Sequence, residues 1–186
     1  MARLIAYNFL SLNGYYKGAN EDISWHTHGE EESKYSEEML ARDNILVFGR
    51  KTYEHMASFW PMPFASDMFP VVANGMNNSE KLVITTNPKF ETSWNNSRVV
   101  IGDVVGKMKE LKQTSAKDMA ILGSGSIISL FSDHRLIDEY QIMVDPVAIV
   151  SGTPVFYGIK NTLNLKLTGF RTFKSGVVLL NYNLNN

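Results

Sequence analysis

The stretch 121–131, Ile-Leu-Gly-Ser-Gly-Ser-Ile-Ile-Ser-Leu-Phe, joins two apolar segments through four small residues. Residues 119–122 form a continuous apolar run that is typical of a buried strand, whereas the apolar residues of 127–131 recur at helical offsets. A glycine break between a strand and a helix leaves unpaired N–H groups at the positive end of the helix dipole, where a phosphate can bind. The stretch equally suits a tight turn capped by Ser124 or Ser126, and by itself it does not separate the two interpretations.

The same order of strand and helix recurs upstream of this stretch. The predicted strands are 3–14, 44–49, 81–87, 97–102 and 118–123, and the predicted helices are 30–43, 50–59, 104–114 and 124–134. Residues 60–64, Trp-Pro-Met-Pro-Phe, predict a proline-rich loop. Such alternation is typical of a largely parallel sheet with helices on both faces.

From residue 139 onward the pattern contains strands only. Residues 139–149, 163–174 and 176–184 predict three strands, and Lys174-Ser175-Gly176 is typical of a hairpin turn between the last two. These strands add an antiparallel edge to the sheet. We therefore predict one domain over residues 1–186, with a three-layer α/β/α fold and a mostly parallel central sheet with antiparallel C-terminal edge strands.

Composition narrows the possible partners. The chain has 186 residues, 44% of them hydrophobic, and 18 basic and 19 acidic side chains give a formal charge of −1. A balanced charge gives no general attraction for nucleic acid or for an anionic membrane. The chain has no cysteine, which excludes disulfides and thiolate metal sites, and we expect no metal. The apolar run at the N-terminus is too short for a signal peptide or a membrane span, so we expect a cytoplasmic protein.

Small and polar residues stand at the ends of four of the predicted strands. They are Gly49, Arg50, Lys51 and Thr52 at the end of the second strand, Thr85, Thr86 and Asn87 at the end of the third, Gly102 and Asp103 at the end of the fourth, and Gly123, Ser124, Gly125 and Ser126 at the end of the fifth. Ligands of such sheets bind beyond the carboxyl ends of the strands. Together these residues predict a site for an elongated anion, although Arg50 and Lys51 also suit solvated surface charges and Thr52 and Asp103 suit helix caps.

Four segments of the chain resemble the dihydrofolate reductase-like family, and within it the C-terminal reductase domain of the bifunctional riboflavin-biosynthesis deaminase/reductase. They are 11–18, 46–54, 121–128 and 136–156, which stand in the order of the family's motifs and cover nearly the whole chain. The resemblance implies a dihydrofolate reductase-like fold with NADPH as the cofactor. The chain departs from the family at Asn13, where aspartate is usual, and this departure leaves the substrate open.

The resemblance also implies roles for the residues at the strand ends. Residues 49–52 would contact the adenosine-side phosphates, residues 85–87 would lie near the 2′-phosphate, and residues 123–126 would hold the pyrophosphate. No acidic residue directly follows the predicted strands that end at residues 49 and 87. We therefore predict a preference for NADPH over NADH.

Hydride transfer to a C=N or C=O bond requires a proton donor beside the substrate. The resemblance places Glu31 or Glu32 nearest to the acid of dihydrofolate reductases, and it places Asn13 in the loop that closes over the nicotinamide. Trp25 is a candidate wall of the substrate pocket or an anchor of its loop, and the two glutamates also suit a solvated first helical turn. His26 and His28 remain further options for the donor.

The leading functional prediction is an NADPH-dependent reductase of a small heterocycle, pterin-like or pyrimidine-like, similar to 5-amino-6-(5-phosphoribosylamino)uracil reductase. A cofactor-binding module without turnover and a purely structural protein stay open as alternatives. Without cysteine the chain cannot carry the zinc motif of the deaminase step, so a role in riboflavin biosynthesis rests on analogy. The apolar residues of the last two strands predict a homodimer.

Overall fold

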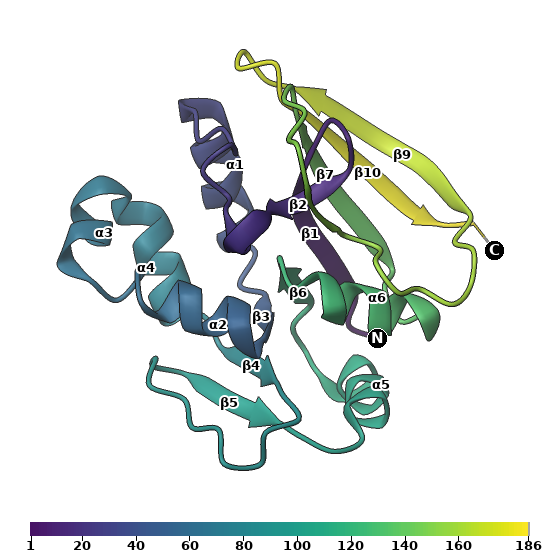
Figure 1. Ribbon diagram of the computed structural model, residues 1–186. Helices are drawn as coiled ribbons and strands as arrows, with labels where there is room; N and C mark the ends of the chain where they lie inside the picture. The colour runs from purple at the N-terminus through teal and green to yellow at the C-terminus, as the bar shows by residue number, and fades with distance from the viewer. Residues whose placement is uncertain (186) are drawn as a thin grey trace.

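The computed structural model describes residues 1–185, whose main feature is an eight-stranded sheet (Figure 1). Its strands are β1 (Leu4–Ser11), β3 (Ile45–Gly49), β4 (Lys81–Ile84), β5 (Ser97–Val100), β6 (Met119–Leu122), β7 (Glu139–Asp145), β9 (Leu165–Thr172) and β10 (Val178–Leu184). They lie in the order β5-β4-β3-β6-β1-β7-β10-β9. A separate pair, β2 (Tyr15–Gly18) and β8 (Gly152–Pro154), was not predicted.

Strand direction agrees with the sequence pattern. The pairs from β5 through β4, β3, β6 and β1 to β7 are all parallel. The pairs β7–β10 and β10–β9 are antiparallel, and the turn between β9 and β10 is closed by a hydrogen bond from Phe173 N to Val177 O at 2.9 Å. The predicted α/β class with an antiparallel C-terminal edge is confirmed. Residue 186, the last residue of the predicted domain, lies outside the described residues.

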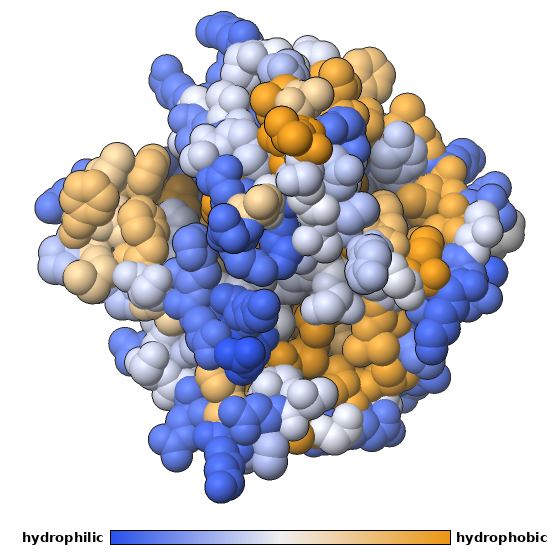
Figure 2. Space-filling model, viewed as in Figure 1, coloured by the Kyte–Doolittle hydropathy of each residue, from blue (hydrophilic) through white to orange (hydrophobic). Residues whose placement is uncertain are grey.

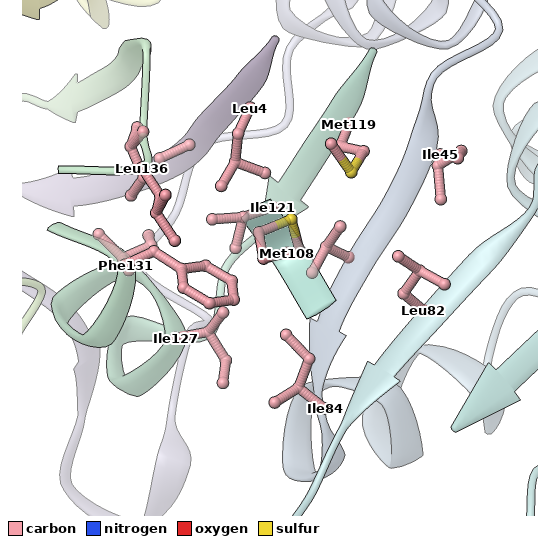
Figure 3. Close-up of a cluster of buried hydrophobic side chains, with 14 of the residues drawn as sticks. Leu4, Ile45, Leu82, Ile84, Met108, Met119, Ile121, Ile127, Phe131 and Leu136 are labelled. Atoms are coloured by element: carbon pink, nitrogen blue, oxygen red, sulfur yellow. The ribbon is translucent and has the colours of Figure 1, made fainter. Parts of the chain in front are cut away.

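Helices cover both faces of the sheet. Helices α1 (Glu30–Leu40), α2 (Arg50–Ala57) and α4 (Pro70–Asn78) pack on one face, and α5 (Val104–Thr114) and α6 (Gly125–Asp133) pack on the other. Figure 3 shows the second layer, where Met108 of α5 and Phe131 of α6 meet Leu4 and Ile121 of the sheet. None of the helices within residues 1–185 combines the length and the apolar character needed to cross a bilayer.

Two helices lie in and beyond the segment that the sequence predicts as a proline-rich loop. Helix α3 (Pro63–Met68) and helix α4 each carry proline in the first turn. Proline is tolerated there because the first backbone N–H groups of a helix have no intrahelical acceptor. The prediction of a loop at 60–64 is therefore wrong from residue 63 onward, and α4 adds Val72 and Met76 to the core.

Apolar side chains are exposed on this same part of the molecule. Met62, Phe64 and Met68 are each more than half exposed, as is Val71 of α4. Figure 2 shows a pale orange surface in the region of α3 and α4. This surface is the outer side of the helices whose inner side contributes to the core.

Lys81, the first residue of β4, is completely buried. Its Nζ donates to the carbonyl oxygens of Asn77, Ser79 and Asn95 at 3.1, 2.7 and 3.1 Å, and it lies 4.4 Å from the ring centroid of Trp94. Burial lowers the pKa of Lys81 to about 8. The ammonium group joins the C-terminal end of α4 to the loop before β5.

Candidate functional site

A cleft of about 1140 Å³ opens at the carboxyl ends of the central strands. Strand β1 pairs with β6 as far as Tyr7 opposite Leu122, but it continues along β7 as far as Ser11 opposite Asp145. The two strands therefore part after Leu122, and Asn8 lines the cleft beyond that point. This is the part of an open α/β sheet at which ligands bind.

Ser124 connects the N-terminus of α6 to the N-terminus of α2 at the edge of the cleft. Its backbone is left-handed, with φ 59°, and its Oγ accepts from Gly49 N and donates to Thr52 Oγ1, both at 2.8 Å. It makes no side-chain cap to α6. A Cβ on Gly49 would lie 3.2 Å from Ile127 Cγ1, so only glycine fits comfortably there. The N-termini of α2 and α6, with N–H groups that have no intrahelical acceptor, therefore lie side by side.

The structure brings most of the predicted cofactor residues to this cleft. Those that line it are Gly49, Arg50, Lys51, Thr52, Thr85, Thr86, Gly123, Ser124 and Ser126. Asn87, Gly102 and Asp103 do not line it. Asp103 instead caps α5 by accepting from Gly106 N at 2.9 Å, and Asn87 accepts from Lys89 N at 3.0 Å within its own loop. The contacts predicted for these three residues are corrected accordingly.

Gly125 also lies outside the lining, and its small size has a different reason from the one predicted. A Cβ on Gly125 would lie 2.7 Å from Cε1 of Tyr16. The glycine therefore makes room for the aromatic ring of Tyr16 in β2. A branched residue at this position would displace Tyr16, so its effect on a ligand would be indirect.

The cations at this end of the cleft are paired with carboxylates. Arg50 Nη1 donates to both oxygens of Glu54 at 2.8 Å, and Glu21 accepts from Lys17 Nζ at 2.6 Å and lies 3.6 Å from Lys51 Nζ. The hydrogen bond from Lys17 lowers the pKa of Glu21. Exposed ion pairs of this kind contribute little stability. A phosphate can therefore displace these carboxylates.

The two predicted acids of α1 both accept from the turn between β9 and β10, but only one of them is buried in the cleft. Glu32 is buried, lines the cleft and accepts from Ser175 Oγ. Glu31 does not line the cleft, and its carboxylate accepts from Lys174 N at 2.8 Å. That hydrogen bond lowers the pKa of Glu31, which keeps the carboxyl ionised. The position of Glu31 therefore does not suit a proton donor, whereas the position of Glu32 does.

A buried histidine and aspartate lie beside Glu32. His26 Nδ1 is 2.8 Å from Asp145 Oδ2, and Thr27 N donates to the other carboxylate oxygen at 2.8 Å. The His26 ring stacks on Phe9 with centroids 3.8 Å apart, and His28 lies edge-on to it at 4.4 Å. Burial, followed by the neighbouring His26, lowers the pKa of His28. Within residues 1–185, no three or more His, Cys, Asp or Glu side chains are grouped to hold a metal ion.

Asn13 and Trp25, the other predicted catalytic residues, lie outside the cleft lining. Asn13 accepts from Ser11 Oγ at 2.8 Å and donates to the carbonyl oxygen of Ile149 at 2.8 Å, which joins two loops. Trp25 packs edge-on against Phe9 with centroids 5.6 Å apart. Asn13 thus holds two loops together, and the packing of Trp25 on Phe9 agrees with the loop anchor that the sequence left open for it.

Sequence reasoning missed an apolar wall of the cleft. It is formed by Met39, Leu40, Met56, Trp60, Val72 and Met76. These residues come from α1, from α2 and the segment after it, and from α4. No element is predicted between residues 64 and 81, and the helical spacing of Val72 and Met76 is the signal that could have found the wall.

Comparison with known proteins agrees with this architecture. The family model of the RibD C-terminal domain matches residues 2–179. The uncharacterized protein YyaP of Bacillus subtilis (strain 168) is 27% identical over 184 residues, which cover 98% of this chain and 95% of YyaP.

Two solved structures share the fold at low identity. The Thermotoga maritima diaminohydroxyphosphoribosylaminopyrimidine deaminase/5-amino-6-(5-phosphoribosylamino)uracil reductase superposes with a TM-score of 0.70 at 16% identity, over 99% of this chain and 57% of that one. Dihydrofolate reductase from Enterococcus faecalis, complexed with NADP(H), gives 0.65 at 17% identity, over 99% and 97% of the two chains. The dihydrofolate reductase-like fold inferred from the four sequence segments is thus confirmed, and the chain belongs to the RibD C-terminal domain family.

Proposed function

We propose that this protein is an NADPH-dependent reductase that transfers a hydride to a small heterocyclic substrate. The observation that carries the proposal is the cleft beyond Leu122, with two helix N-termini at one end and the buried carboxyl of Glu32 at the other. The family supports it, and one solved structure of the same fold was obtained with NADP(H). The residues at the strand ends fit the cofactor, because backbone N–H groups and nearby cations are the donors that phosphates require.

The two halves of the cleft would have separate tasks. The bound nicotinamide supplies the hydride. The first turns of α2 and α6 hold the phosphates, and Arg50 and Lys51 supply positive charge. On the α1 side of the cleft, Glu32 would exchange a proton with the heterocycle, and the Asp145 carboxylate would orient the ring of His26, which also lines the cleft.

The apolar wall supports a flat substrate. Thioether and indole side chains adapt to the face of a ring and contribute no charge. The cleft therefore fits a pterin-like or pyrimidine-like ring between the sheet and α1. The family relationship favours a reaction in riboflavin biosynthesis, and we include that pathway in the proposal.

Two measurements test the proposed function. NADPH fluorescence reports binding, and the decay of NADPH absorbance with a panel of pterins and pyrimidines, including 5-amino-6-(5-phosphoribosylamino)uracil, reports turnover. Binding with turnover on one compound supports the reductase. Binding without turnover across the panel supports a cofactor-binding module instead, and no NADPH binding overturns both.

Cofactor preference is expected to depend on Arg50 and Lys51. Replacement of both by alanine should weaken NADPH binding by about 10- to 100-fold for each lost phosphate contact and should weaken NADH binding less, because NADH lacks the 2′-phosphate. Glu21→Gln should strengthen NADPH binding, because it frees Lys17 and Lys51 from their shared partner. Competitive titration of NADPH against NADH measures both effects, with Lys166→Ala on β9 as the control. Equal affinities of the wild type for NADPH and NADH would contradict the proposed preference for NADPH.

We also propose a homodimer formed through the C-terminal edge of the sheet. Strand β9 is the edge strand, and it exposes Leu167 by 47% and Phe170 by 70%. Light scattering should give twice the 21.0 kDa of one chain, and Phe170→Lys should return the mass to that of a monomer. A wild-type mass of one chain would contradict the proposal.

A further inference from the structure

Asn8 carries a buried amide group that has no partner. The residue is 1% exposed, and within the described part of the chain its Nδ2 makes no hydrogen bond. Its Oδ1 accepts from Phe9 N at 2.9 Å. That bond fixes the orientation of the amide, because the oxygen must face the N–H donor. The nitrogen is therefore the end that is left without an acceptor.

The side chain of Asn8 belongs to the α6 face of the sheet. Side chains alternate along a strand, and Leu4 and Ala6 of β1 pack with α6 in the core, whereas Tyr7 and Phe9 pack on the opposite face. Asn8 follows Leu4 and Ala6 in this alternation, so its side chain lies on the same face as theirs. Its neighbour on β7 is Ile142, which has no side-chain acceptor, and β6 has already ended.

An unpaired buried donor is unfavourable in the free protein, and native structures contain few of them. Asn8 lines the cleft, so a ligand can supply the missing acceptor. Ile127 and Leu130 of α6, which also line the cleft, are apolar, so an uncharged acceptor suits this face better than an anion. The carbonyl oxygen of a carboxamide on a flat ring is such an acceptor.

We propose that Asn8 Nδ2 donates to the carboxamide oxygen of the nicotinamide ring. This inference rests on the proposed function. The cofactor is favoured over the substrate because Asn8 shares its face with the α6 start, whereas the substrate-side groups Glu32 and His26 lie on the α1 side. The hydrogen bond would set the angle of the ring and so the face that its reactive carbon presents to the substrate.

The test compares two ligands that differ in the nicotinamide ring. Isothermal titration with NADPH and with 2′-phospho-ADP-ribose, which lacks the ring, gives separate affinities. Asn8→Leu should lower the affinity for NADPH by about tenfold and leave the affinity for 2′-phospho-ADP-ribose within about twofold of the wild-type value. Asn181→Leu is the matched control, because Asn181 also holds an unpartnered amide atom but lies on β10, away from the cleft lining.

Asn8→Asp covers the case in which the leucine variant does not fold. Aspartate keeps an oxygen that accepts from Phe9 N, but it replaces the amide donor by an acceptor. This variant should also bind NADPH more weakly than the wild type and leave the affinity for 2′-phospho-ADP-ribose nearly unchanged. An equal loss of both ligands, or no loss of NADPH, overturns the inference while leaving the proposed function intact. If the wild type binds neither ligand, the inference and the proposed function both fail.

Discussion

Glu32→Gln is expected to lower turnover by about 100-fold or more while leaving NADPH affinity close to that of the wild type. Glutamine keeps the shape of the side chain and can still pair with Ser175, but it cannot release a proton. The phosphates of the cofactor would bind at the starts of α2 and α6, which Glu32 does not contact. The measurement is kcat with the best compound of the panel, together with NADPH titration.

The neighbouring residue supplies the control for this experiment. Glu31→Gln makes the same substitution in the same helical turn, yet Glu31 does not line the cleft and bonds to the backbone of Lys174. Its kcat should remain within about twofold of the wild type. If both variants turn over normally, the buried carboxyl has no part in proton transfer and another group beside the substrate must carry it.

Lys81→Met is expected to destabilise the protein by about 2–4 kcal/mol at pH 7. Methionine fills a similar volume, but it leaves the carbonyl oxygens of Asn77, Ser79 and Asn95 without their common donor. Urea unfolding followed by circular dichroism measures the loss. Lys89→Met, at an exposed position, is the control and should change stability by less than about 0.5 kcal/mol.

The stability difference should also depend on pH. Burial lowers the pKa of Lys81 to about 8, below the ordinary value of 10.5 that holds in the unfolded chain. Between these two values the unfolded state binds more protons, so the free energy of unfolding contributed by Lys81 rises with pH. The gap between the wild type and Lys81→Met should therefore widen from pH 8 to pH 10. A gap that narrows over this interval would contradict the lowered pKa.

The framework of the fold could be predicted because each buried strand is a local apolar run. The run at 119–122 and the glycines after it predict both β6 and the turn into α6, and the loss of helical spacing after residue 139 predicts the antiparallel edge. Most residues predicted at the strand ends do line the cleft, because the carboxyl ends of parallel strands share one edge of the sheet.

The substrate side depends on contacts that are distant in the chain. Glu31 and Glu32 are adjacent in sequence but about 100° apart around a helix, and only the packing of α1 decides which one faces the cleft. The His26–Asp145 pair joins residues on different elements. No local sequence pattern marks such a pair. In the sequence His26 therefore looks like an ordinary loop residue, and only the folded structure shows that it contacts Asp145.

The position of β1 constrains how this chain can fold as it is synthesised. It is made first, yet its two neighbours in the sheet are β6 and β7, with Leu4 opposite Met119 and Ser11 opposite Asp145. Neither edge of this apolar strand can form its native pairing until most of the chain has left the ribosome. Until then both edges are exposed or covered by transient partners. Unpaired strand edges promote association between chains. Slow synthesis or truncation before residue 139 should therefore favour aggregation over a partly folded domain.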